Sequence, residues 1–152
     1  MNCCNATEGG TPACAEGSTG APAAGPATAQ TPYDRIGGEE GIRRLTRRFY
    51  ELMDSLPEAA ACRAVHPPSL VRAEQRLFEY LSGWLGGPPL FVERHGHPML
   101  RRRHFVARID SPEIEGWLIC FTRAWADTVE DRQLGAAVLP QVVKLAQHMR
   151  NA

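Results

Sequence analysis

Apolar side chains recur at helical spacing along almost all of residues 32–152, and no stretch alternates between apolar and polar residues as a β-strand does. In GEEGIRRLTRRFYELMDSL, Ile42, Leu45, Phe49 and Met53 fall on one face of a helix. The same spacing returns in SLVRAEQRLFEYLSGWL, SPEIEGWLICFTRAWADTVE and DRQLGAAVLPQVVKLAQHMRN. The sequence therefore predicts an all-α domain of about five helices.

Capping and helix-breaking residues predict where these helices begin and end. Ser69 and Ser111 are placed to cap two of them, and GGPP terminates the first of the two. Pro140 interrupts the last apolar pattern, which predicts a kink or two shorter helices. Residues 88–100 follow no period and are expected to be irregular, ahead of a short basic segment that carries His104.

The first 31 residues differ in composition from the rest of the chain. They are dominated by Ala, Gly, Thr, Pro and Ser and contain no aromatic residue. Such a segment buries too little apolar surface to offset the entropy lost on ordering. We therefore expect a disordered tail over residues 1–31 and one folded domain over residues 32–152.

Charge, hydropathy and cysteine content exclude several classes of protein. The chain has 17 Lys and Arg against 17 Asp and Glu, and this zero net charge argues against a polyanion-binding protein. No apolar run approaches the roughly 18 residues of a membrane span, and the N-terminus lacks the features of a secretory signal. Five cysteines without a C-x-x-C pair favour neither a disulfide framework nor a zinc knuckle. We expect a cytoplasmic protein that binds neither nucleic acid nor membrane.

The run GHPMLRRRHF, residues 96–105, is the clearest candidate for chemistry. A closed zinc site would need further ligands at compatible spacing, which His95, His97 and His104 do not supply. Nucleic-acid binding would need a wider basic field. A third possibility is a single histidine that ligates haem iron, with arginines that pair with the haem carboxylates.

Several blocks in a fixed order resemble the truncated haemoglobins of group II, the two-over-two globins found largely in bacteria. These blocks are YDRIGGEEGI, RRFYELM, CRAVHPPSL, GWLGGPPLFVERHGHPMLRRRHF and EGWLICF, and the resemblance covers about residues 32–151. It implies a two-over-two helical sandwich around haem b, iron protoporphyrin IX. The sequence departs from the family at His95, where an aromatic residue is common, and at Pro140.

The resemblance implies a set of haem-binding residues. His104 falls on the position of the proximal histidine, which is the iron ligand. Arg103 and Arg76 fall on basic positions that face the haem propionates. Leu77 and Phe91 fall on positions that line the haem pocket. Loss of the proximal histidine would indicate a helical interaction module without haem, and His104 is present.

Four further residues fall on the distal side by the same resemblance. Tyr50 and Trp117 match donors to the bound ligand, His66 matches an aromatic or histidine position near it, and Ala73 falls where many globins place a distal histidine. Each hydrogen bond from such a donor to a charged ligand would contribute about 1–3 kcal/mol to the free energy of ligand binding.

The resemblance implies a protein that binds O₂, NO and CO, as a monomer or a homodimer. Its role would be oxygen binding or transport. The alternative is a redox enzyme, active in nitric oxide dioxygenation or as a peroxidase, that needs an external reductase.

Overall fold

The computed structural model describes residues 29–152, and within this range every regular element is helical, which confirms the all-α prediction. The elements are α1 (Pro32–Ile36), α2 (Gly38–Ser55), η1 (Pro57–Ala59), α3 (Ala60–Ala64), α4 (Val71–Trp84), α5 (Leu90–His95), α6 (Leu100–Arg103), η2 (His104–Val106), α7 (Ser111–Thr128) and α8 (Arg132–His148). Most of the predicted tail, residues 1–28, lies outside the described residues.

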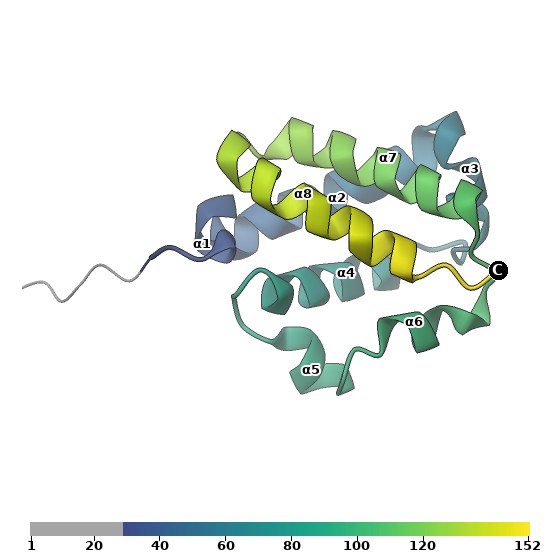
Figure 1. Cartoon of the computed structure of the whole chain (residues 1–152), viewed down its shortest axis with the longest axis horizontal. Coiled ribbons are helices and arrows are strands. Elements are labelled where there is room, and N and C mark those ends of the chain that lie inside the picture. Colours follow the sequence, from purple (N-terminus) through teal and green to yellow (C-terminus); the bar gives the residue numbers. More distant parts are fainter. Residues whose placement is uncertain (1–28) are drawn as a thin grey trace, which may run out of the picture.

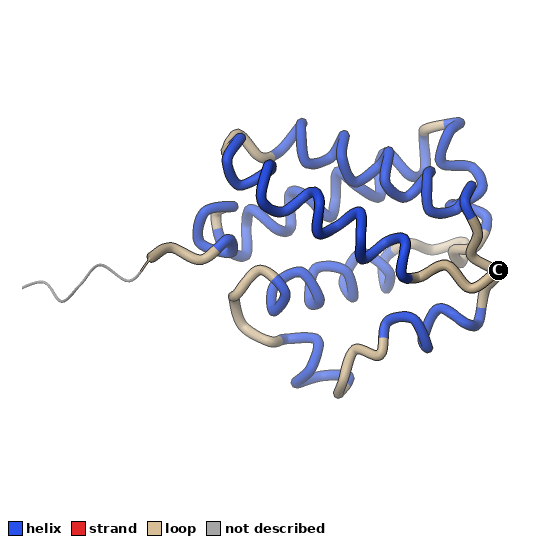
Figure 2. Tube along the Cα trace, viewed as in Figure 1, coloured by secondary structure: helices blue, strands red, loops and turns tan. Residues whose placement is uncertain are grey.

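Four long helices form the body of the domain (Figures 1 and 2). α2 packs most extensively against α7 and also against α4, and α7 packs against α8. α5 packs on α4, while α6 lies at the outer edge of the molecule and leads through η2 to α7. The extra elements relative to the sequence prediction are short helices between these long ones.

The apolar face predicted for α2 is buried as expected. Ile42, Leu45 and Phe49 are fully buried, and Met53 is nearly so. Burial of each such side chain contributes about 1.5–3 kcal/mol. This face, together with α7 and α4, therefore forms the main apolar core.

The junction of α1 and α2 depends on glycine at two positions. Gly37 has a φ of 102°, in the left-handed region that favours glycine, and it ends α1. Gly41 is buried, and a Cβ there would lie 1.9 Å from the carbonyl oxygen of Ile36. The two helices therefore approach one another at a point where only a hydrogen atom fits.

Three local predictions are corrected by the structure. Asp110, and not Ser111, caps α7, because its carboxylate accepts from the Ser111 N–H while Glu113 accepts from the Asp110 N–H. Ser69 does not cap α4, whose first flanking residue is Leu70. Of the two alternatives predicted at Pro140, two shorter helices is wrong: α8 continues through Pro140 as one helix, because Val138 and Val142 on either side of it are held in the core.

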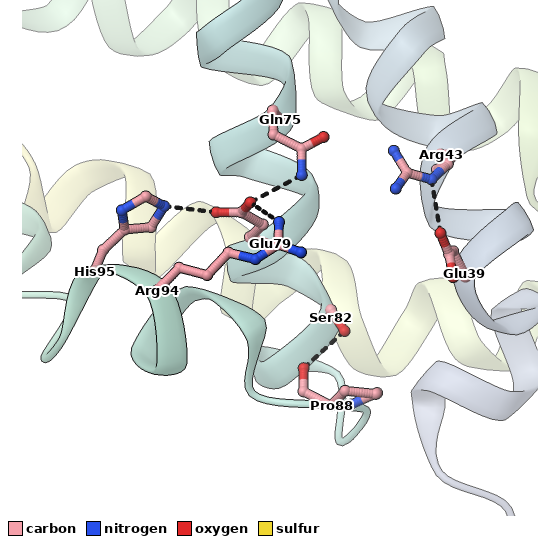
Figure 3. Close-up of polar contacts among 8 residues, drawn as sticks. All are labelled: Glu39, Arg43, Gln75, Glu79, Ser82, Pro88, Arg94 and His95. Carbon is pink, nitrogen blue, oxygen red and sulfur yellow. Dashed lines mark hydrogen bonds and ion pairs between the residues drawn. The ribbon is translucent and has the colours of Figure 1, made fainter.

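The segment before His104 is also more regular than predicted. Pro89 precedes α5, and a second short helix, α6, follows the Gly96–Met99 connection. The turn between α4 and α5 is closed by the Ser82 hydroxyl, which donates to the Pro88 carbonyl at 2.8 Å (Figure 3). At the start of α1, Thr31 and Asp34 form a capping box, so ordered structure includes the last residue assigned to the tail.

The Gly41→Ala variant tests the contact between α1 and α2. Alanine normally stabilises a helix interior by roughly 1 kcal/mol relative to glycine, whereas here we expect a loss of about 1–3 kcal/mol in the free energy of unfolding. Urea unfolding measures it, with the exposed Glu40→Ala on the same helix as the control. A Gly41→Ala protein as stable as the parent would contradict the close approach.

Candidate functional site

One largely apolar cavity of about 340 Å³ lies between the long helices and the α5–α6 segment. It is lined by every site residue that the sequence analysis selected: Tyr50, His66, Ala73, Arg76, Leu77, Phe91, Arg103, His104 and Trp117. These residues come from segments far apart in the chain, so the fold brings the predicted set to a single place.

The orientation of His104 is fixed by its own backbone segment. Its Nδ1 lies 2.6 Å from the carbonyl oxygen of Leu100. Because a carbonyl only accepts, Nδ1 carries the proton, and the neutral ring keeps its lone pair on Nε2. Histidines that bind metals commonly donate their other ring N–H to a carbonyl in this way. His104 therefore offers one nitrogen ligand to a group in the cavity.

The two arginines that line the cavity, Arg103 and Arg76, differ in their hydrogen bonds and ion pairs. The Arg103 guanidinium donates from Nε to the carbonyl of Pro98 at 2.8 Å and from Nη2 to the carbonyl of His95 at 2.9 Å. It thus fastens the connection between α5 and α6. Arg76 on α4 is exposed and has no acidic partner among residues 29–152.

Tyr50 on α2 and Trp117 on α7 are positioned by Phe49. The Phe49 ring lies 4.8 Å from that of Tyr50 and 5.1 Å from that of Trp117, and Trp117 stacks on Phe121 at 5.0 Å. Within the described part of the chain, neither the Tyr50 hydroxyl nor the Trp117 indole N–H has a protein hydrogen-bond partner. Burial raises the pKa of Tyr50, so its hydroxyl stays protonated and remains a donor.

His66 behaves differently from these two donors. Its Nδ1 donates to the carbonyl of Cys62 at 2.8 Å, which leaves the Nε2 lone pair as an acceptor. Burial lowers the pKa of His66, so the ring is neutral near pH 7. Its ring lies 6.0 Å from that of Tyr50.

A buried carboxylate on α4 joins this helix to α5 (Figure 3). Glu79 is 2% exposed. It accepts from Gln75 at 2.8 Å, from His95 at 2.7 Å and from Arg94. The Phe91 ring packs 4.9 Å from that of His95, so this network also holds one wall of the cavity. His95, which replaces the aromatic residue common in the family, thus has Glu79 as its hydrogen-bond partner.

The balance of burial and hydrogen bonding sets the pKa of Glu79. Burial alone would raise the pKa of this carboxyl group, but hydrogen bonds from Gln75, Arg94 and His95 outweigh burial and lower it. Glu79 is therefore ionised near neutral pH, and its charge is compensated by α5.

Two contributors to the site have no clear signature in the sequence. Asn151, beyond α8, donates to the carbonyls of His104 and Ala107 at 3.1 Å each and accepts from the Ile109 N–H at 2.9 Å. Cys62 lines the cavity, and burial raises the pKa of its thiol to about 12. Cys62 is therefore an apolar wall residue rather than a nucleophile.

Comparison with known proteins agrees with this architecture. The bacterial-like globin family matches residues 31–151. The group II 2-on-2 haemoglobin of Agrobacterium tumefaciens superposes with a TM-score of 0.80 at 54% identity, over 82% of this chain and 98% of that one. A truncated oxygen-avid haemoglobin from Bacillus subtilis superposes with a TM-score of 0.73 at 33% identity, over 80% of this chain and 100% of that one. The group 2 truncated haemoglobin YjbI of Bacillus subtilis is 33% identical over 120 residues, 79% of this chain and 88% of that protein.

The chain belongs to the bacterial-like globin family, and within it to the group II truncated haemoglobins. Membership implies a haem that binds diatomic ligands. The residues of the cavity fit such a group, because apolar walls, one correctly protonated histidine and rim arginines are the features that a haem requires.

Other kinds of site find less support among the described residues. Within residues 29–152, no three His, Cys, Asp or Glu side chains gather closely enough to hold a metal ion together. No helix in that same range has the length and apolar character to cross a membrane.

The Glu79→Gln variant tests the role of the buried carboxylate. Loss of charged hydrogen bonds should lower the free energy of unfolding by roughly 1–3 kcal/mol near pH 7. Since the folded pKa is lowered, this stability exists above the ordinary carboxyl pKa of about 4.3 and disappears as the pH falls through the folded value. The difference between variant and parent in urea unfolding should therefore shrink in acid.

The exposed Glu115→Gln on α7 is the matched control for this measurement, since Glu115 has no ion-pair partner within the described range. Equal unfolding midpoints for the two variants near pH 7 would contradict an anchoring role for Glu79.

Proposed function

We propose that this globin binds haem b in the cavity through Nε2 of His104 and holds O₂ there with donors from Tyr50 and Trp117. The observation that carries the proposal is the Nδ1 contact from His104 to the Leu100 carbonyl, which leaves Nε2 as the free ligand nitrogen on a cavity residue. Haem iron supplies the reversible binding of diatomic molecules, including NO and CO.

The protein itself orients the groups that surround the ligand and determines which of them carry a proton. The Tyr50 hydroxyl and the Trp117 N–H are donors without protein partners in residues 29–152, held in place by the Phe49 ring. Donors fixed before the ligand arrives stabilise negative charge on it without reorganisation. His66, with its proton on Nδ1, contributes an acceptor to this side of the cavity instead of a third donor.

The cationic rim completes the proposed site. Arg76 has its whole guanidinium free of acidic partners in the described chain, and Nη1 of Arg103 makes no protein hydrogen bond there. Both residues line the cavity. They would pair with the two haem carboxylates, while Leu77 and Phe91 pack against the macrocycle.

The alternative role is redox chemistry, such as nitric oxide dioxygenation or peroxidase activity. The observation in its favour is the pair of strong donors beside Ala73, whose small side chain leaves room in the cavity for a second reactant. Donors that slow the release of O₂ suit a reaction of the bound O₂ better than they suit the delivery of O₂. Sustained turnover would require electrons from an external donor.

The His104→Ala variant tests the iron ligand. Without the imidazole we expect stable haem retention to be lost, because Nε2 of His104 is the proposed ligand of the iron. Haem content per chain after gel filtration, measured from the absorption spectrum, gives the answer. His97→Ala is the matched control, since His97 does not line the cavity. An unchanged haem content and spectrum in His104→Ala would refute the assignment.

The Trp117→Phe variant tests the distal donor. Removal of the indole N–H should speed O₂ dissociation about tenfold, equivalent to roughly 1.4 kcal/mol, within the range for hydrogen bonds to charged groups. Stopped-flow displacement of O₂ measures the rate. Trp125→Phe makes the same chemical change outside the cavity and should leave it unaltered. Equal rates in all three proteins would remove Trp117 from this role.

A further inference from the structure

One segment at the edge of the cavity is basic without any acidic residue. Residues 94–109 contain five arginines and no Asp or Glu, although the whole chain has equal numbers of acidic and basic residues. Arg94 is paired with Glu79, and Arg103 is bonded to backbone carbonyls. Arg108 lies 3.8 Å from Asp110. Arg101 and Arg102 have no acidic partner within residues 29–152 and are exposed.

Apolar side chains are exposed beside these two arginines. Phe105 is 59% exposed and Val106 is 94% exposed. α6 ends at Arg103, and Phe105 and Val106 lie in the short turn η2 that follows it directly. The Arg101 guanidinium lies 5.8 Å from the centre of the Phe105 ring. Arg101, Arg102, Phe105 and Val106 form what we call the α6 patch.

The α6 patch adjoins the cavity directly. Val106 lines the cavity while it remains almost fully exposed, so it lies on the rim. Phe105 follows His104, the proposed iron ligand, in the chain. α6 lies along the outer edge of the molecule (Figure 1). A protein seated on this patch would therefore come close to whatever group His104 holds.

We propose that the α6 patch is the docking surface for a small acidic electron-transfer protein that reduces the haem. The proposal rests on the proposed function. The step is a transfer of one electron: the partner is oxidised by one electron and ferric iron is reduced to ferrous iron, with no bond formed or broken. Complementary charge would orient the partner during encounter, and Phe105 and Val106 would form the dry centre of the contact.

The composition of the patch favours a protein partner over the other anionic surfaces. Protein interfaces are enriched in Arg and aromatic residues. Anionic membranes attract clusters of four to eight basic residues at about 1 kcal/mol each, and the α6 patch contains two, Arg101 and Arg102, of which Arg101 also donates to the carbonyl of Arg150. Nucleic acid requires a wider basic field than a single helical turn provides.

The test uses the haem-loaded full chain in the ferric state and a reduced flavodoxin, an acidic flavoprotein, as the probe. Stopped-flow measurement under CO follows the formation of ferrous protein. The double variant R101E/R102E should lower the second-order rate constant about tenfold at low ionic strength, and the loss should diminish with added salt. The control R123E/R132E changes the net charge equally, at exposed arginines that do not line the cavity, and should retain most of the rate.

Reduced lumiflavin, a free flavin with no protein surface that could dock on the α6 patch, serves as a second reductant at high salt, where its own negative charge is screened. It should reduce the parent and both variants at the same rate. An equal loss with lumiflavin would overturn the proposal, because the arginines would then act on the haem site itself. Titration of the parent with oxidised flavodoxin should shift the amide resonances of residues 99–108, and shifts elsewhere alone would overturn it as well.

The remaining outcomes separate this proposal from the proposed function. A chain that shows no haem spectrum refutes the proposed function before any flavodoxin is added, and the electron-transfer proposal falls with it. A chain that binds haem but is reduced by flavodoxin equally fast in all forms refutes the docking surface alone. If R101E/R102E instead loses binding to phosphatidylserine vesicles, the patch is a membrane-binding surface and the proposal is wrong.

Discussion

The packing of aromatic rings around Phe49 is the interaction on which the rest of the structure depends. This fully buried ring lies between α2 and α7, the two helices that contact one another most, and touches the rings of Tyr50 and Trp117. The contacts that join the helices therefore also aim the two donors into the cavity. The packing that stabilises the fold therefore also positions the side chains that we propose stabilise the ligand, so a change to Phe49 would disturb both.

The side of the cavity that carries His104 is held in place by a different kind of contact. α6 and η2 contain no buried residue, so apolar packing contributes little to their placement. Hydrogen bonds to backbone carbonyls replace it, from Arg103 to the segment before His104 and from Asn151 to His104 itself. A rigid aromatic wall thus faces a histidine whose segment is held mainly by polar contacts.

Helical periodicity predicted the fold class and the long helices, because it is a local property, whereas the residues that line the cavity were implied by the resemblance to a known family. The predictions that failed depended on tertiary contacts. Pro140 was expected to kink α8 or to divide it into two helices, and the division is wrong because Val138 and Val142 on either side of it are buried in the core. The pairing of Glu79 with His95 spans 16 residues and depends on how the intervening turn closes, which no periodic pattern encodes. Whether His66 offers a donor or an acceptor to the cavity also depends on a tautomer that only its contact with Cys62 defines.

The hydrogen bonds of Asn151 connect the end of the chain with the segment that carries His104. Its amide group reaches the carbonyl of His104, 47 positions earlier in the chain, and the same side chain closes the stretch between η2 and α7. The end of α8 is therefore coupled through Asn151 to the segment that carries His104. Local unfolding that begins at the end of α8 would reach His104 without passing through the apolar core.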